Sequence, residues 1–222
     1  MGTLFLVRHG QASLGAADYD NLSERGHQQS ERLGAYFRQQ GVVFDAVWTG
    51  TLKRHQQTLE GLARGMGCEL AAIPHPAWNE YDSAALLAAQ QITPPMPTSS
   101  PEAYRRYFQL LRDALRGWMD GVLSPQGMPS YQGFRSGIVE QLTALRGQPL
   151  KRVLVVSSGG PIATATGAVL GTTPETTIEL NLRLRNTALT QLHVGPQKWG
   201  LVSFNEIPHL ATVPAADWVT HA

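Results

Sequence analysis

Short apolar segments alternate with amphipathic ones along most of the chain. Apolar runs at 3–7, 42–48 and 69–73 each have the length and residue types of a strand. Between these runs, apolar residues recur at helical spacing, at Leu22, Leu33 and Phe37 and then at Leu52, Leu59 and Leu62. This alternation predicts an α/β fold, a three-layer sandwich in which a mostly parallel central sheet carries helices on both faces.

The same pattern resumes in the second half of the chain. Residues 134–145 have helical spacing, and the most apolar run of the chain, 153–156, predicts a central strand. Two alternating segments, 184–194 and 199–204, are joined by a short turn at 195–198. They predict an antiparallel hairpin at the edge of the sheet.

The region from about 74 to 133 interrupts this rhythm. Its proline-rich stretch 93–101 cannot form a helix interior or a central strand. Ser100 and Pro101 then suit the N-cap and the first turn of a helix. That helix carries an apolar stripe that we expect in the core, formed by Tyr104, Tyr107, Phe108, Leu111, Leu115 and Trp118. We interpret 74–133 as a helical insertion, a lid over the active edge of the sheet, within a single domain spanning 1–222.

Composition narrows the class of protein. Hydrophobic residues are 42% and charged residues 16%, which is typical of a globular chain. The net charge of +1 argues against non-specific nucleic-acid binding, although a local basic pocket is compatible with it. The only cysteine is Cys68, which excludes an intrachain disulfide and a cysteine-based metal cage. Because no apolar stretch has membrane-spanning length and no signal peptide is recognisable, we expect a cytoplasmic protein without a membrane partner.

Residues suited to phosphate chemistry follow two of the predicted strands. Arg8, His9 and Gly10 come directly after the first strand, and a Ser-Gly-Gly sequence at 158–160 follows the central one. Arg54 lies one turn into the helix after the second strand. Because the carboxyl ends of parallel strands meet at one edge, we expect an imidazole, two guanidinium groups and helix N–H groups to converge on one phosphate. For the tripeptide alone, a strand ending in polar loop residues is an equal alternative.

Further candidates lie next to these junctions. Ser158 and Gly159 are candidate phosphate-binding residues at the second junction, and Gly10 would let the backbone approach closely at the first. Gln11 and Ser13 can donate hydrogen bonds to phosphate, with helix capping or loop solvation as an equal alternative for each. Arginines supply the positive charge and the other histidines lack metal-ligand spacing, so neither a metal nor a cofactor is expected.

The ordered motifs resemble the histidine phosphatase (phosphoglycerate mutase-like) superfamily. In order, they are Arg8-His9-Gly10 and the segments 22–28, 49–58, 156–160, 185–187 and 204–210. The resemblance covers most of the chain outside the insertion. It implies that His9 is a nucleophile that forms a phosphohistidine, and that Arg8 and Arg54 bind the phosphoryl group. It also implies that a carboxylate in the insertion protonates the leaving oxygen.

Two assignments within this resemblance stay open. Glu80 is the best match to the acid because the family places its glutamate shortly after the third strand; Asp82 is the rival, and either residue can equally be a solvated loop carboxylate. Where the family has a second histidine that binds the phosphoryl oxygens, this chain has Ser158, a shorter and uncharged donor. His55, beside Arg54, could turn toward the pocket, but a position on the helix surface is the favoured expectation.

The combined prediction is a phosphomonoester hydrolase that acts through a phosphohistidine at His9, with turnover weakened by Ser158. The alternative is a protein without useful catalysis that binds a phospho-ligand or a phosphoprotein. A phosphoglycerate mutase is less favoured, because a mutase must protect its phosphorylated state from water. The expected partner is a phosphorylated small molecule or a phosphoprotein, not a nucleic acid, and the oligomeric state is open.

Overall fold

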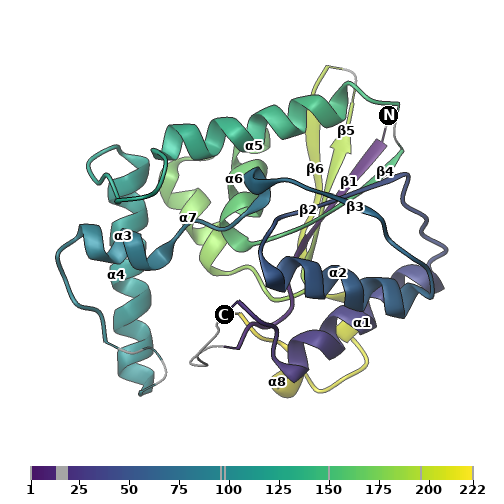
Figure 1. The fold of residues 1–222 in the computed structure, drawn as a ribbon, viewed down its shortest axis with the longest axis horizontal. Helices are drawn as coiled ribbons and strands as arrows, with labels where there is room; N and C mark the ends of the chain where they lie inside the picture. Colours follow the sequence, from purple (N-terminus) through teal and green to yellow (C-terminus); the bar gives the residue numbers. More distant parts are fainter. Residues whose placement is uncertain are drawn as a thin grey trace.

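The computed structural model of the protein describes residues 2–13, 20–95, 97, 99–149, 151–195 and 197–221. Its strands form a six-stranded sheet in the order β3-β2-β4-β1-β5-β6 (Figure 1). The strands are β1 Gly2–Arg8, β2 Ala46–Thr49, β3 Ala72–Pro74, β4 Arg152–Ser157, β5 Leu189–Val194 and β6 Trp199–Glu206. The pairings among β3, β2, β4 and β1 are parallel, whereas β5 pairs antiparallel with both β1 and β6.

This arrangement confirms the predicted α/β fold. Strand β4 lies inside the sheet between β2 and β1, as its apolar sequence predicted. The predicted hairpin is present, and β6 forms one edge of the sheet. Pro196 in the predicted turn lies outside the described residues, as do Met96 and Thr98 of the proline-rich stretch.

Helices cover both faces of the sheet (Figure 1). Helices α1 and α2 pack on one face, and α5 and α6 on the other. The helices are α1 Glu24–Gln39, α2 Lys53–Met66, α3 Ser83–Ala89, α4 Pro101–Met119, α5 Tyr131–Arg146, α6 Gly159–Leu170, α7 Pro174–Leu182 and α8 Ala215–Trp218, with 3-10 turns at Pro76–Trp78 and Pro208–Leu210. No helix within the described ranges is both long enough and apolar enough to cross a membrane.

The alternation of side chains along β1 explains the two layers. Phe5 and Val7 pack with Leu33 and Phe37 of α1, whereas Leu4 lies in the cluster formed with α5 and α6. Successive side chains of a strand point to opposite faces, so one apolar strand supplies both cores. Because residues 4–7 of β1 and 153–156 of β4 are all apolar, these strands suit the interior of a sheet that is covered on both sides.

Local sequence signals also set the helix starts. The Ser23 side chain accepts a hydrogen bond from the Gly26 N–H at the start of α1, and Ser100 does the same for Ala103 in α4. Strand limits are less accurate: β2 begins at Ala46 instead of residue 42, because its ladder starts where β4 offers a partner. Likewise β3 covers only Ala72–Pro74 instead of 69–73.

A third apolar cluster lies beyond the carboxyl ends of the strands. It joins α3, α4 and α7 through buried residues that include Leu86, Leu115, Trp118 and Ile178. Figure 1 shows α3 and α4 to one side of the sheet, next to α7. This cluster holds the segment before α5 in place at the edge where the predicted site residues lie.

Candidate active site

The predicted site residues converge at the carboxyl ends of β1 and β4. Arg8 is opposite Ser157 in the parallel ladder, and the His9 N–H donates a hydrogen bond to the Ser157 carbonyl at 2.9 Å. A cavity of about 500 Å³ opens here, with Arg8, His9, Arg54 and Glu80 in its lining. Four of the residues that the sequence singled out thus share one cavity at this edge of the sheet.

His9 is buried and held in one orientation. Its Nδ1 lies 2.7 Å from the Gly10 carbonyl oxygen, so Nδ1 carries the proton and donates this hydrogen bond. Burial, followed by the charges of Arg54 and Arg8 and by His55, holds the pKa of His9 well below its usual range. The ring is therefore neutral near pH 7, and its Nε2 carries a free lone pair.

Gly10 allows the backbone after His9 to approach α1. A Cβ at position 10 would lie only 2.4 Å from the Gly26 carbonyl oxygen. The Gly10 N–H donates to the Thr58 hydroxyl of α2 at 3.0 Å. The close approach of the backbone at Gly10 is thus made to helix α1.

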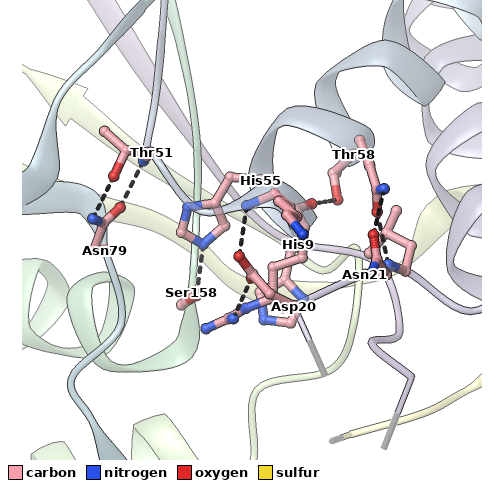
Figure 2. Close-up of polar contacts among 12 residues, drawn as sticks. His9, Asp20, Asn21, Thr51, His55, Thr58, Asn79 and Ser158 are labelled. Carbon is pink, nitrogen blue, oxygen red and sulfur yellow. Dashed lines mark hydrogen bonds and ion pairs between the residues drawn. The ribbon is translucent and has the colours of Figure 1, made fainter. Parts of the chain in front are cut away.

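Both arginines are buried and make hydrogen bonds to protein groups. Arg8 Nη1 donates to the carbonyl oxygens of Leu184 and His221. Arg54 Nη1 forms an ion pair of 2.7 Å with Asp20 Oδ1 (Figure 2). These contacts fix the two guanidinium groups beside His9, where they supply positive charge to the cavity.

Glu80 and Asp82 have different environments. Glu80 accepts hydrogen bonds from the Gly160 N–H at 3.0 and 3.2 Å, and burial raises its pKa although Arg54 and Arg8 oppose this shift. Asp82 instead caps α3, since its Oδ1 accepts from the backbone N–H groups of residues 84 and 85 at 2.9 and 3.0 Å. A carboxyl group that retains its proton suits a general acid, so this contrast favours Glu80.

Three other residues near the predicted site make contacts within the protein. The Gly160 N–H was expected to be available to an anion, but it is bonded to Glu80. Gln11 is not among the residues that line the cavity, because its side-chain oxygen accepts from Ser23 Oγ at 2.8 Å at the start of α1. The backbone of Gly159 packs closely against Asn181. A Cβ added at position 159 would lie 2.5 Å from the Asn181 Oδ1.

The sequence led us to expect His55 on the surface of its helix, and this expectation is wrong. His55 is fully buried, and its Nε2 lies 2.7 Å from Ser158 Oγ (Figure 2). Position 55 was misjudged because helical spacing cannot reveal a polar partner from β4 and α6. The two ends of this hydrogen bond are 103 residues apart in the sequence.

The aromatic stripe of α4 is divided between two environments. Leu111, Leu115 and Trp118 are buried in the core as predicted. Tyr107 and Phe108 pack against this core cluster and also line the cavity, whereas Tyr104, which was expected in the core, is exposed. Helical spacing showed that these residues share a face, but not where the core ended and the cavity began.

The C-terminal segment contributes contacts that the sequence did not indicate. Thr220 accepts a backbone hydrogen bond from the Asn186 N–H at 2.8 Å, and its hydroxyl donates to Asn186 Oδ1 at 2.9 Å. Asn186 in turn donates to the His9 carbonyl oxygen at 3.2 Å. The guanidinium carbon atoms of Arg25 and Arg32 lie over the Trp218 ring, 4.5 and 4.3 Å from its centroid. His221 then reaches the cavity lining.

The described residues contain no group of three or more histidine, cysteine, aspartate or glutamate side chains placed to hold a metal ion. A mostly parallel sheet with a histidine, two arginines and a buried carboxyl group at its carboxyl edge offers the groups that can hold a phosphate. The family model of the histidine phosphatase superfamily (branch 1) matches residues 4–207. The chain therefore belongs to the histidine phosphatase superfamily.

The sequence is similar to those of phosphoglycerate mutases, and the fold is similar to that of a solved phosphatase. The chain is 35% identical over 88 residues to the 2,3-bisphosphoglycerate-dependent phosphoglycerate mutase of Mesorhizobium japonicum, and the match covers 36% of this chain and 42% of that relative. It is 28% identical over 203 residues to the probable phosphoglycerate mutase GpmB of Cronobacter sakazakii, covering 88% and 86% of the two chains. A solved structure of Entamoeba histolytica phosphoserine phosphatase in complex with 3-phosphoglyceric acid matches with a TM-score of 0.67 and 20% identity, covering 95% of this chain and 100% of that one.

Proposed function

We propose that the protein is a phosphomonoester hydrolase that works through a phosphohistidine at His9. The observation that carries this proposal is the orientation of His9: Nδ1 is engaged by Gly10, and the ring faces a cavity that also contains two arginines and a buried glutamic acid. A neutral imidazole with a free Nε2 is a competent nucleophile toward phosphorus. Membership of the superfamily supports the same reaction class.

In the first step, Nε2 of His9 attacks phosphorus in line with the ester oxygen. The new N–P bond forms as the P–O bond breaks, and Glu80 transfers its proton to the departing alkoxide. Arg8 and Arg54 neutralise charge on the non-bridging oxygens. The raised pKa of Glu80 supports this role, because the carboxyl must still hold a proton when the ester arrives.

In the second step, the Glu80 carboxylate accepts a proton from water as the water oxygen attacks phosphorus. The N–P bond then breaks, inorganic phosphate is released, and both His9 and Glu80 return to their starting states. One residue serves as acid and then as base, so no further titrating group is required.

A binding protein without turnover is the second candidate, favoured by Ser158 in place of the family's second histidine and by the Asp20 carboxylate paired with Arg54. Phosphate release from a panel of phosphomonoesters, combined with intact-mass spectrometry of the protein, separates the two. Release and a phosphate adduct that both disappear in His9→Ala support the hydrolase. Binding of phosphate or vanadate without release supports the binding protein, and release that persists in His9→Ala rejects His9 as the nucleophile.

A further inference from the structure

The side chains of His55 and Ser158 form a buried pair next to the proposed nucleophile. Both residues have no exposed surface, and the centroids of the His55 and His9 rings are 5.8 Å apart. The His55 ring fits because position 50 is glycine: a Cβ there would lie 2.1 Å from His55 Nδ1. Space for this imidazole is therefore built into the turn that follows β2.

The hydrogen-bonding pattern indicates which nitrogen of His55 carries the proton. Burial and the charge of Arg54 lower the pKa of His55 to about 3, so its ring is neutral at pH 7. Nδ1 is buried and has no hydrogen-bond partner within the described chain. A buried N–H without a partner is rarer and costlier than an unused lone pair, which places the proton on Nε2. Nε2–H then donates to Ser158 Oγ across the 2.7 Å contact.

This direction of donation determines what the serine can do. A hydroxyl oxygen that accepts from Nε2–H keeps its own proton free to donate to another acceptor. Ser158 follows β4 directly beside the point where His9 follows β1, since Arg8 and Ser157 are paired in the ladder. The Ser158 side chain makes no capping hydrogen bond to α6. Its hydroxyl proton is thus not used by α6. Ser158 is fully buried and is not one of the residues that line the cavity, whereas His9, at the end of the neighbouring strand, is one of them.

We propose that His55 and Ser158 together replace the second phosphoryl-binding histidine of the superfamily. Ser158 donates a hydrogen bond to a phosphoryl oxygen during transfer, and His55 is the positioning residue that holds the hydroxyl in the donating orientation. This assignment rests on the proposed function. It explains why a serine at this junction is accompanied by a buried histidine from α2, a position at which the sequence alone suggested a solvated residue.

A double-mutant cycle tests the pair. We would measure kcat and KM for p-nitrophenyl phosphate, inhibition by orthovanadate and by phosphate, and thermal stability, for Ser158→Ala, His55→Ala and the double variant. Removing one transition-state donor lowers rates by about 10²- to 10³-fold. We expect such a loss in kcat for Ser158→Ala, with weaker vanadate inhibition, and little further loss when His55→Ala is added. Gln56→Ala, an exposed neighbour on the same helix, is the matched control.

If the loss of kcat in the double variant equals the product of the losses in the two single variants, the residues act independently and the proposed coupling is overturned. His55→Gln is the second variant. Its side-chain amide can donate to Ser158, so its kcat should be higher than that of His55→Ala. If kcat changes only in step with the melting temperature across these variants, His55 has a merely structural role. If the wild type releases no phosphate, the proposed hydrolase fails and vanadate binding decides about the pair. The proposed role of the pair is overturned if Ser158→Ala binds vanadate as tightly as the wild type does, or if the wild type does not bind vanadate.

The lining of the rest of the cavity carries a separate inference about the substrate. Beyond the phosphate-facing residues, most of the cavity lining is apolar or aromatic, formed by Leu52, Pro97, Tyr107, Phe108, Leu111 and Leu182, and Tyr81, Ser83 and Asn181 add polar groups. Among the described lining residues, Arg8 and Arg54 are the only permanent cations, and Glu80 and Asp82 are acidic. Burial and the nearby charges of Arg8 and Arg185 lower the pKa of His221, so its ring is uncharged near neutral pH.

We infer that the alcohol part of the substrate is apolar, an aryl or branched alkyl group, and carries no second anion. The inference rests on the proposed function. A carboxylate placed among these rings would lose its hydration without gaining a cation. A cavity of about 500 Å³ is large enough for such a group.

Paired substrates test this inference. We expect kcat/KM for 1-naphthyl phosphate to exceed that for 3-phosphoglycerate by at least about tenfold. Leu182→Lys, which adds a cation to the lining, should narrow this ratio, whereas Leu170→Lys at an exposed site should not. Preference of the wild type for 3-phosphoglycerate would overturn the inference. If no ester is hydrolysed, the proposed hydrolase function fails. The inference about the substrate is then tested by competition of the same two compounds against vanadate binding. It is overturned if 3-phosphoglycerate competes as strongly as 1-naphthyl phosphate or more strongly.

Discussion

The carboxylate of Glu80 accepts a hydrogen bond from the backbone N–H of Gly160, at 3.0 Å from Oε1 and 3.2 Å from Oε2. This contact joins the loop before α3 to the start of α6. A Cβ at position 160 would lie 2.2 Å from Glu80 Oε1, so a larger residue there would displace the carboxylate. The proposed acid is therefore held by the same strand-to-helix junction that carries Ser158.

Glu80→Gln should show an effect that depends on the leaving group. Without the acid, esters of poor leaving groups should lose about 10²- to 10⁴-fold in kcat. The first step with p-nitrophenyl phosphate should lose less, because p-nitrophenolate leaves without a proton. Steady-state rates across a series of phenyl phosphates, with a rapid-mixing measurement of the p-nitrophenolate burst, would check this. Asp82→Asn is the control, and an equal loss in that variant would reassign the acid to Asp82.

The pH dependence of kcat/KM should have its alkaline limb set by Glu80. The transfer step needs the protonated carboxyl, so the rate should fall as pH rises through the raised pKa of Glu80. The His9 ring must be neutral to attack phosphorus. Because its pKa is lowered, the ring stays neutral as pH falls through 6.5, so the acidic limb of the profile should lie well below that pH. Profiles corrected for ionisation of the substrate phosphate would test both limbs. An alkaline limb that persists unchanged in Glu80→Gln contradicts the assignment.

Removing residues 215–222 should weaken substrate binding and turnover together. This segment anchors Asn186 through Thr220, and Arg8 donates to the His221 carbonyl oxygen. Loss of these contacts frees the guanidinium and the His9 loop, so we expect KM to rise and kcat to fall. Trp218→Ala should have a smaller effect in the same direction, and Trp218→Phe should retain stacking with Arg25 and Arg32. Wild-type kinetics in the truncated protein would show that the segment is dispensable.

Ser158→His should lower activity rather than restore the family's usual pocket. The His55 ring already occupies the space beside position 158, with Nε2 2.7 Å from the serine oxygen. Two imidazoles cannot share that space without moving the backbone. Combining Ser158→His with His55→Ala should recover kcat relative to the single Ser158→His variant. Kinetics and melting curves of both variants would decide, and a faster single variant would mean that His55 moves aside easily.

Leu115→Ala should destabilise the protein through the cluster of α3, α4 and α7. Leu115 is 1% exposed, and its truncation leaves a cavity that costs about 2–5 kcal/mol. The melting temperature should fall by several degrees for a chain of this size. Val122→Ala is the matched control because Val122 is 79% exposed. Equal melting temperatures for the two variants would remove Leu115 from the core.

Several features of the site could be predicted because they depend on neighbouring residues in the chain. Arg8 and His9 follow an apolar strand, and parallel strands place their carboxyl ends at one edge, so these residues had to meet the β4 junction. The helix N-caps at Ser23 and Ser100 are likewise determined within four residues. Glu80 was favoured over Asp82 by the family motif, and the capping role of Asp82 supports the same choice.

Other features depend on residues that are distant in the chain. The burial of His55 requires both the small Gly50 and a hydroxyl from Ser158, and the packing of Tyr107 and Phe108 requires a cavity formed by several elements. Gln11 was expected near phosphate because it is close to His9 in sequence, but Ser23 holds its side chain elsewhere.

Apolar periodicity and the order of strand-end motifs thus determined the α/β layers, the edge of the sheet at which the candidate residues lie and the family, because each depends on local pattern or on chain order. Tertiary packing alone decided which polar side chains are buried and which partner each one meets. The reason is physical: burying a polar group costs free energy unless a partner satisfies it, and such partners come from anywhere in the chain. The pairing of His55 with Ser158 was therefore visible only once β4 and α2 lay side by side.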